Sequence, residues 1–140
     1  MVSSTTTEWT VGSSQYNEVN RTQLIIRNMS RLRRIVTGSN CFGSVRLFEL
    51  NGLFELENVV IGQKSFTIEK TGDIWNSKRT DGTCRIKNCP KLVSIQIGVY
   101  SFGDYSSSFE LSNLPSLQSI DIGGSCFLWA PVFSLTGSID

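Results

Sequence analysis

The chain of 140 residues is long enough for one domain and too short for two. Its 13 basic and 12 acidic side chains give a net charge of +1, so we expect neither a nucleic-acid partner nor a membrane surface. Histidine is absent, which excludes Ser-His-Asp and Cys-His nucleophiles and the usual zinc enzymes. The first residues lack a signal-peptide pattern, which favours the cytoplasm, or the cell exterior if the chain is a fragment of a longer protein.

Four glycines mark a repeat along the chain. Gly38, Gly62, Gly98 and Gly123 each follow a short alternation of inward apolar and outward residues, which is typical of a strand with one buried face. They are 24, 36 and 25 residues apart, so the middle interval is one repeat with an insertion of about 11. An aromatic residue comes four positions after each glycine, at Phe42, Phe66, Phe102 and Phe127.

Residues 1–20 fit this pattern as a degenerate N-terminal repeat. If Gly12 takes the glycine position, Trp9 and Val11 fall on inward strand positions and Tyr16 falls on the phenylalanine position. The leucine of the other repeats is replaced by Thr6. A solenoid needs such a polar end against water, so we expect this repeat to act as a cap.

Residues 21–132 are predicted to form four full repeats with two strands each. A second apolar pair in each repeat is followed two residues later by Asn or Gly, which predicts a turn with positive φ. The residues between the apolar pairs place Arg85 between Glu49 and Glu110 on neighbouring strands, a favourable arrangement. The predicted turn positions are Asn28, Gly52, Asn88, Asn113 and Gly137.

An insertion interrupts the third repeat at about residues 67–82. Its Gly-Asp and Asp-Gly pairs predict a hairpin-like excursion. Trp75 beside Lys78 and Arg79 has the composition of an interface hot spot, although Trp75 could equally fold back on the solenoid. Residues 133–140 then begin a further repeat with Phe133 and Leu135.

The repeat resembles that of leucine-rich-repeat proteins. The family pattern Leu-x-x-Leu-x-Leu-x-x-Asn/Cys-x-Leu matches Leu117-x-x-Ile120-x-Ile122-x-x-Ser125-x-Phe127, and the closing phenylalanine is similar to repeats of protist and bacterial surface-type proteins. The resemblance covers about residues 5–140 and implies one solenoid domain over 1–140. Only five or six residues separate each phenylalanine from the next apolar pair, which leaves no room for a convex helix. We therefore expect a mainly β leucine-rich-repeat solenoid with short strands on both sides.

The four cysteines are interpreted as structural thiols. Cys84 and Cys89 do not have the spacing of a zinc knuckle, and no histidine is present to complete a mixed site. Both fall on inward positions that other repeats fill with apolar residues. A disulfide and a metal site remain the alternatives, and we expect no cofactor and no metal.

The outward positions of the main sheet are the place where such solenoids usually bind partners. The positions are flanked by Glu8 and by the basic residues Arg31 and Arg33. A solvated face without a partner is the alternative interpretation. The candidate partner-binding residues are Arg34, Val36, Asn58, Val60, Gln96 and Asp121 of the sheet and Trp75, Lys78 and Arg79 of the insertion.

The sequence contains no catalytic constellation and no phosphate-binding loop, so we do not expect an enzyme. The first hypothesis is a non-catalytic module that binds a protein through the main sheet and the inserted loop. The alternative is a self-assembling structural protein, a head-to-tail homo-oligomer in which Phe133 and Leu135 of one copy meet Trp9 and Val11 of the next.

Overall fold

The computed structural model describes residues 2–67, 81–103, 105, 108–124 and 126, and the backbone of 133–136. The fold is a β-solenoid, and the described residues contain strands and turns without helices. The predicted all-β solenoid with strands on both sides is confirmed. Most of the insertion and Phe127 lie outside the described residues.

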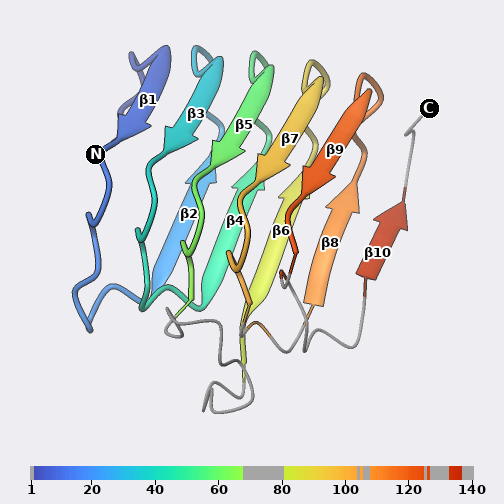
Figure 1. Cartoon of the computed structure of the whole chain (residues 1–140). Helices are drawn as coiled ribbons and strands as arrows, with labels where there is room; N and C mark the ends of the chain where they lie inside the picture. Colours follow the sequence, from blue (N-terminus) through green and yellow to red (C-terminus); the bar gives the residue numbers. More distant parts are fainter. Residues whose placement is uncertain are drawn as a thin grey trace.

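Two parallel five-stranded sheets, named A and B here, face each other across the core (Figure 1). The chain alternates between them, because each turn gives one strand to each sheet. Sheet A contains β1 (Glu8–Val11), β3 (Arg34–Thr37), β5 (Asn58–Ile61), β7 (Ser94–Ile97) and β9 (Ser119–Ile122). Sheet B contains β2 (Gln23–Arg27), β4 (Leu47–Asn51), β6 (Thr83–Lys87), β8 (Ser108–Ser112) and β10 (Phe133–Thr136).

The strand register follows the repeat in the sequence. Trp9 pairs with Ile35, Ile35 with Val59, and Val59 with Ile95, and these inward side chains are buried. From β3 onward, the glycine that follows each sheet A strand lies against the backbone of the preceding turn. A Cβ added to Gly98 would lie 2.5 Å from the Gln63 amide nitrogen, which explains why larger residues are absent from this position.

The turns after β2, β4, β6 and β8 have the backbone predicted for them, whereas Gly137 lies outside the described residues. Asn28, Gly52, Asn88 and Asn113 have φ values of 55°, 69°, 57° and 55°. The side chains of this turn also bond along the solenoid axis. Asn113 Nδ2 donates to Asn88 Oδ1 at 2.9 Å, and Asn88 Nδ2 donates to Asn51 Oδ1 at 2.9 Å. An asparagine ladder therefore joins successive turns at this corner.

The predicted aromatic column is a continuous ring stack in the core. Tyr16 stacks on Phe42 at a centroid distance of 5.2 Å, Phe42 on Phe66 at 5.1 Å, and Phe66 on Phe102 at 4.6 Å. Tyr16 thus occupies the phenylalanine position, as expected for the degenerate first repeat. These aromatic residues also have positive φ, which the apolar pattern did not predict.

A buried ladder of Ser and Cys lies beside the ring stack. Ser65 Oγ donates to the Gly38 carbonyl at 3.1 Å and accepts the Cys41 amide at 3.2 Å. Ser101 Oγ repeats the pattern with the Gly62 carbonyl at 2.7 Å and the Ser65 amide at 3.1 Å. Each hydroxyl therefore bonds to two backbone groups of the turn before it, a carbonyl and a buried amide.

Tyr105 crosses the middle of the core. Its ring is fully buried, and its hydroxyl donates to the Val45 carbonyl at 2.6 Å, although one turn lies between these two residues. Gly82, in that intermediate turn, has a φ of 133°, and an added Cβ would lie 2.7 Å from the Tyr105 ring. Glycine at position 82 therefore leaves the space that the tyrosine occupies.

The solenoid differs at its two ends. At the first turn Trp9 is 7 % exposed and Val11 is 4 % exposed, and Val2 packs against the core. At β9 the inward side chain of Ile120 is 38 % exposed. The apolar residues of the first repeat are therefore covered, whereas β9 leaves apolar surface accessible.

Candidate functional site

The candidate sheet residues lie on two neighbouring rows of the outer face of sheet A. Arg34 and Asn58 share one row, in which Glu8 pairs with Arg34 and Arg34 with Asn58. The second row runs parallel to it, one outward position further along each strand. This second row contains Thr10, Val36, Val60, Gln96 and Asp121.

The structure does not place the other candidate residues on these two rows. Trp75, Lys78 and Arg79 lie outside the described residues. The backbone positions of Phe133 and Leu135 pair with Phe109 and Leu111 in sheet B. Trp9 and Val11 point into the core, so their side chains do not form an open docking surface.

The charged residues on the outer face of sheet A have no ion pairs among the described residues. Glu8, Arg34 and Asp121 are exposed and make no salt bridge there. Between them lie Val36 and Val60, both half-buried. This face therefore combines unpaired charges at its margins with a mildly apolar centre.

The outer face of sheet B is organised differently. Glu49 is only 3 % exposed, and its carboxylate lies 2.7 Å from Arg27 Nε and 3.8 Å from Arg85 Nη1. Arg85 Nε in turn lies 3.5 Å from Glu110 Oε2. The predicted placement of Arg85 between two glutamates is confirmed, and Arg27 extends the chain of charges. The acidic groups of this face are thus satisfied within the molecule.

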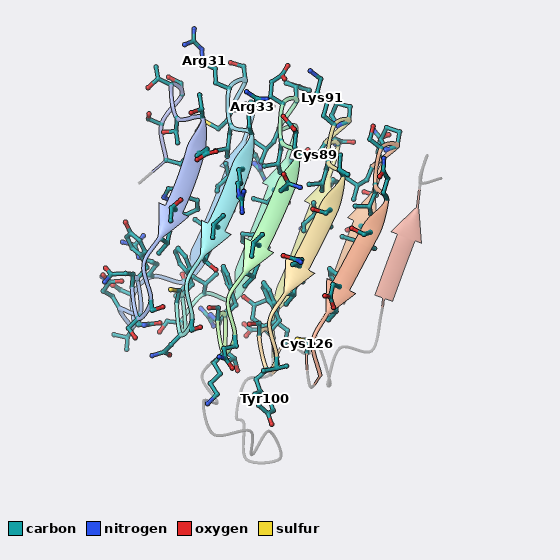
Figure 2. The ribbon with its side chains drawn as sticks, turned by 45° about the horizontal axis from the view of Figure 1, so that its top comes forward. Arg31, Arg33, Cys89, Lys91, Tyr100 and Cys126 are labelled. Carbon is teal, nitrogen blue, oxygen red and sulfur yellow. The ribbon has the colours of Figure 1, made fainter. Side chains whose placement is uncertain are left out.

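Basic side chains and acidic partners lie where the strands of sheet A begin. Arg31, Arg33 and Lys91 lie along one long edge of the solenoid, and Tyr100 and Cys126 lie along the opposite edge (Figure 2). Arg33 Nε bonds to Glu57 Oε2 at 3.1 Å, and Lys91 Nζ bonds to Glu55 at 2.8 Å. Beside them is a hollow of about 430 Å³, lined by Thr7, Glu8, Arg33, Arg34, Glu57 and Asn58.

The cysteines are free thiols, so the disulfide alternative is wrong. Burial raises the pKa of Cys84 far above its usual value and raises the pKa values of Cys89 and Cys126 to about 11. Protonated thiols of this kind are weak nucleophiles. Within the described ranges, no group of His, Cys, Asp or Glu residues could hold a metal ion.

Several residues that stabilise the fold could not be identified by comparing equivalent positions of the repeats one at a time. The Arg33–Glu57 and Lys91–Glu55 pairs join neighbouring turns, and their signal is opposite charge at intervals of 24 and 36 residues. Tyr105 gave no such signal, because its partner is a backbone carbonyl two turns away.

Comparison with known proteins identifies no relative of this chain. No protein-family model, no curated protein and no solved structure matches it. In the part of the chain that the structure describes, no helix is long and apolar enough to cross a membrane.

Proposed function

We propose that this protein is a non-catalytic interaction module of the leucine-rich-repeat type, which binds a protein through the outer face of sheet A. The inserted loop at about 67–82 is a second candidate contact. The observation that supports this choice of face is the contrast between the sheets. Sheet B joins Arg27, Glu49, Arg85 and Glu110 in one chain of ion pairs, whereas the charged groups of sheet A have no ion pair with any described residue.

A partner can cover sheet A without breaking contacts within the molecule. On sheet B, a partner would have to compete with ion pairs around the nearly buried Glu49. On sheet A, the half-buried Val36 and Val60 supply apolar area, and the unpaired charges at the margins supply specificity. The flat five-stranded arrangement presents these groups together on one surface.

Self-assembly is the second candidate function, supported by the exposed inward side chain of Ile120 at β9. An apolar core residue at the last strand of sheet A is a contact that another copy could cover. The buried Trp9 and Val11 do not offer the complementary surface for head-to-tail docking. Binding through sheet A is therefore the function that the geometry supports best.

The test uses peptides selected for binding to the folded protein from a phage library of random dodecapeptides. Chemical-shift changes in the ¹⁵N-labelled protein would locate the bound peptide. Val60→Arg places a bulky charge at the centre of sheet A and should weaken binding by roughly tenfold or more. Ile25→Arg is the matched control, because Ile25 is an exposed apolar residue on the outer face of sheet B. Shifts confined to sheet B, or equal losses in both variants, would contradict the proposal.

A further inference from the structure

The two arginines without an ion pair in the described ranges lie together in the chain. Arg31 and Arg34 are both exposed, and they precede or begin β3. The other arginines of the described residues are in ion pairs, as Arg21–Glu18, Arg27–Glu49, Arg33–Glu57, Arg46–Asp81 and Arg85–Glu49. Because the other described arginines are in ion pairs, the two exposed guanidinium groups at the start of β3 are available to a ligand.

Glu8 and Arg34 are opposite in charge and adjacent in register, but they do not form an ion pair. Parallel strands are about 4.8 Å apart, so these two side chains leave neighbouring points of sheet A. Glu57 is bonded to Arg33 instead, at 3.1 Å. A carboxylate and a guanidinium without an ion pair in the described ranges therefore extend from paired positions of neighbouring strands.

The backbone beneath this pair is held in place. The Thr7 carbonyl accepts the amide of Arg33 at 2.7 Å and the amide of Arg34 at 3.4 Å. This shared acceptor joins the start of β3 to the chain just before β1. The separation between the Cα atoms of Glu8 and Arg34 is consequently set by the sheet, so the two side chains leave it at a fixed spacing.

Both side chains line the hollow of about 430 Å³ at the start of β1, β3 and β5. Two carboxylates, those of Glu8 and Glu57, line the hollow together with the arginines. A small free anion would therefore meet negative charge as well as positive charge. A ligand with both signs of charge avoids this repulsion. Val36 and Val60 follow on the same strands and extend the contact with apolar area.

We infer that this hollow binds a protein segment that carries an acidic and a basic side chain next to each other. The acidic group bonds to the Arg34 guanidinium, and the basic group bonds to Glu8. Side chains about 5 Å apart, as on one face of a helix or across two strands, match the spacing of the pair. This inference rests on the proposed function, because it specifies the partner chemistry of the sheet A face.

The experiment compares peptides selected on the native chain with peptides selected on the double variant Glu8→Arg/Arg34→Glu. Dodecapeptides from the random phage library are the probe. Peptides selected on the native chain should be enriched in an acidic and a basic residue three or four positions apart, the spacing that places both side chains on one face of a helix. These peptides should bind the double variant at least roughly tenfold more weakly. The double variant should select peptides with the two charges in the opposite order.

Arg46→Glu/Asp81→Arg is the matched control. It exchanges the two partners of an exposed ion pair, whose atoms are 3.2 Å apart and which does not line this hollow. Native-selected peptides should bind this control as they bind the native chain. Peptides that map to sheet A but lack the charge pair, or that bind the double variant unchanged, would overturn the inference and leave the proposed function standing. Peptides that map away from sheet A would instead overturn the proposed function.

Discussion

Three phenylalanines of the ring stack hold a backbone conformation that phenylalanine seldom adopts. Phe42, Phe66 and Phe102 have φ values of 58°, 57° and 55°. The left-handed region costs a residue with a Cβ roughly 1–2 kcal/mol. Full burial of such a side chain stabilises by about 1.5–3 kcal/mol. Burial in the stack therefore offsets the strain at each position.

Phe102→Ala should lower the free energy of unfolding by roughly 3–5 kcal/mol, as for other buried aromatic residues. Phe102→Gly removes the same ring and also the Cβ that resists a φ of 55°, so it should be no less stable than the alanine variant. Urea denaturation measures both. A loss below about 1 kcal/mol for alanine would contradict the burial of the ring. A glycine variant much less stable than alanine would contradict the left-handed backbone.

Ser65 tests the ladder beside the stack. Ser65→Ala leaves the Gly38 carbonyl and the Cys41 amide without their hydroxyl partner, which should cost about 1–3 kcal/mol for each buried group. Ser65→Cys should cost less, because Cys41 Sγ at the equivalent position donates to the Gly12 carbonyl at 3.2 Å. Thermal and urea unfolding of the two variants give the comparison. If both variants are as stable as the native chain, the bonds of the ladder contribute little to stability.

At the scale of the strands, the sequence predicted the columns well and the contacts between them only in part. The strand alternation and the Asn/Gly turns are local signals, so the register of Ile35, Val59 and Ile95 followed from them. Glu8 and Arg34 show the limit. Register alone would pair them, but side-chain conformation decides whether the charges meet, and no local pattern encodes it.

The element with the insertion gives a prediction of its own. Removing 11 residues restores the repeat length, and the sequence alone predicts an intact fold. Tyr105, however, fills space beside Gly82 and reaches Val45. A shortened turn that followed the path of residues 43–47 would place a side chain against that ring. We therefore expect the deletion to lower the melting temperature, and the deletion combined with Tyr105→Val to recover part of the loss.

Circular dichroism melting of the native chain, Tyr105→Val, the deletion and the combination completes a double-mutant cycle. The combined variant should be more stable than the sum of the two single changes predicts. Additive effects would show that the Tyr105 ring and the restored turn do not compete for space. A deletion variant as stable as the native chain would restore the expectation based on repeat length alone.

For the whole molecule, the two ends of the solenoid determine the expected state of association. Because the first repeat buries Trp9 and Val11, we expect light scattering to give the mass of a monomer independent of concentration. Growth with concentration would favour the self-assembly function. In that case Ser134→Pro, which removes a donor from β10, should reduce the large species more than Ser134→Lys does. Equal masses for both variants would place the contact elsewhere.

The bond from Tyr105 to Val45 has a consequence for how the solenoid unravels. Turns of a solenoid normally contact only their neighbours, so an end can fray one turn at a time. The tyrosine connects the turn before β8 to the turn before β4, past the turn that contains β6. Opening β8 alone then also breaks a contact with a more distant turn. Amide hydrogens of β4, β6 and β8 should therefore exchange as one cooperative unit, with β1 and β2 exchanging earlier.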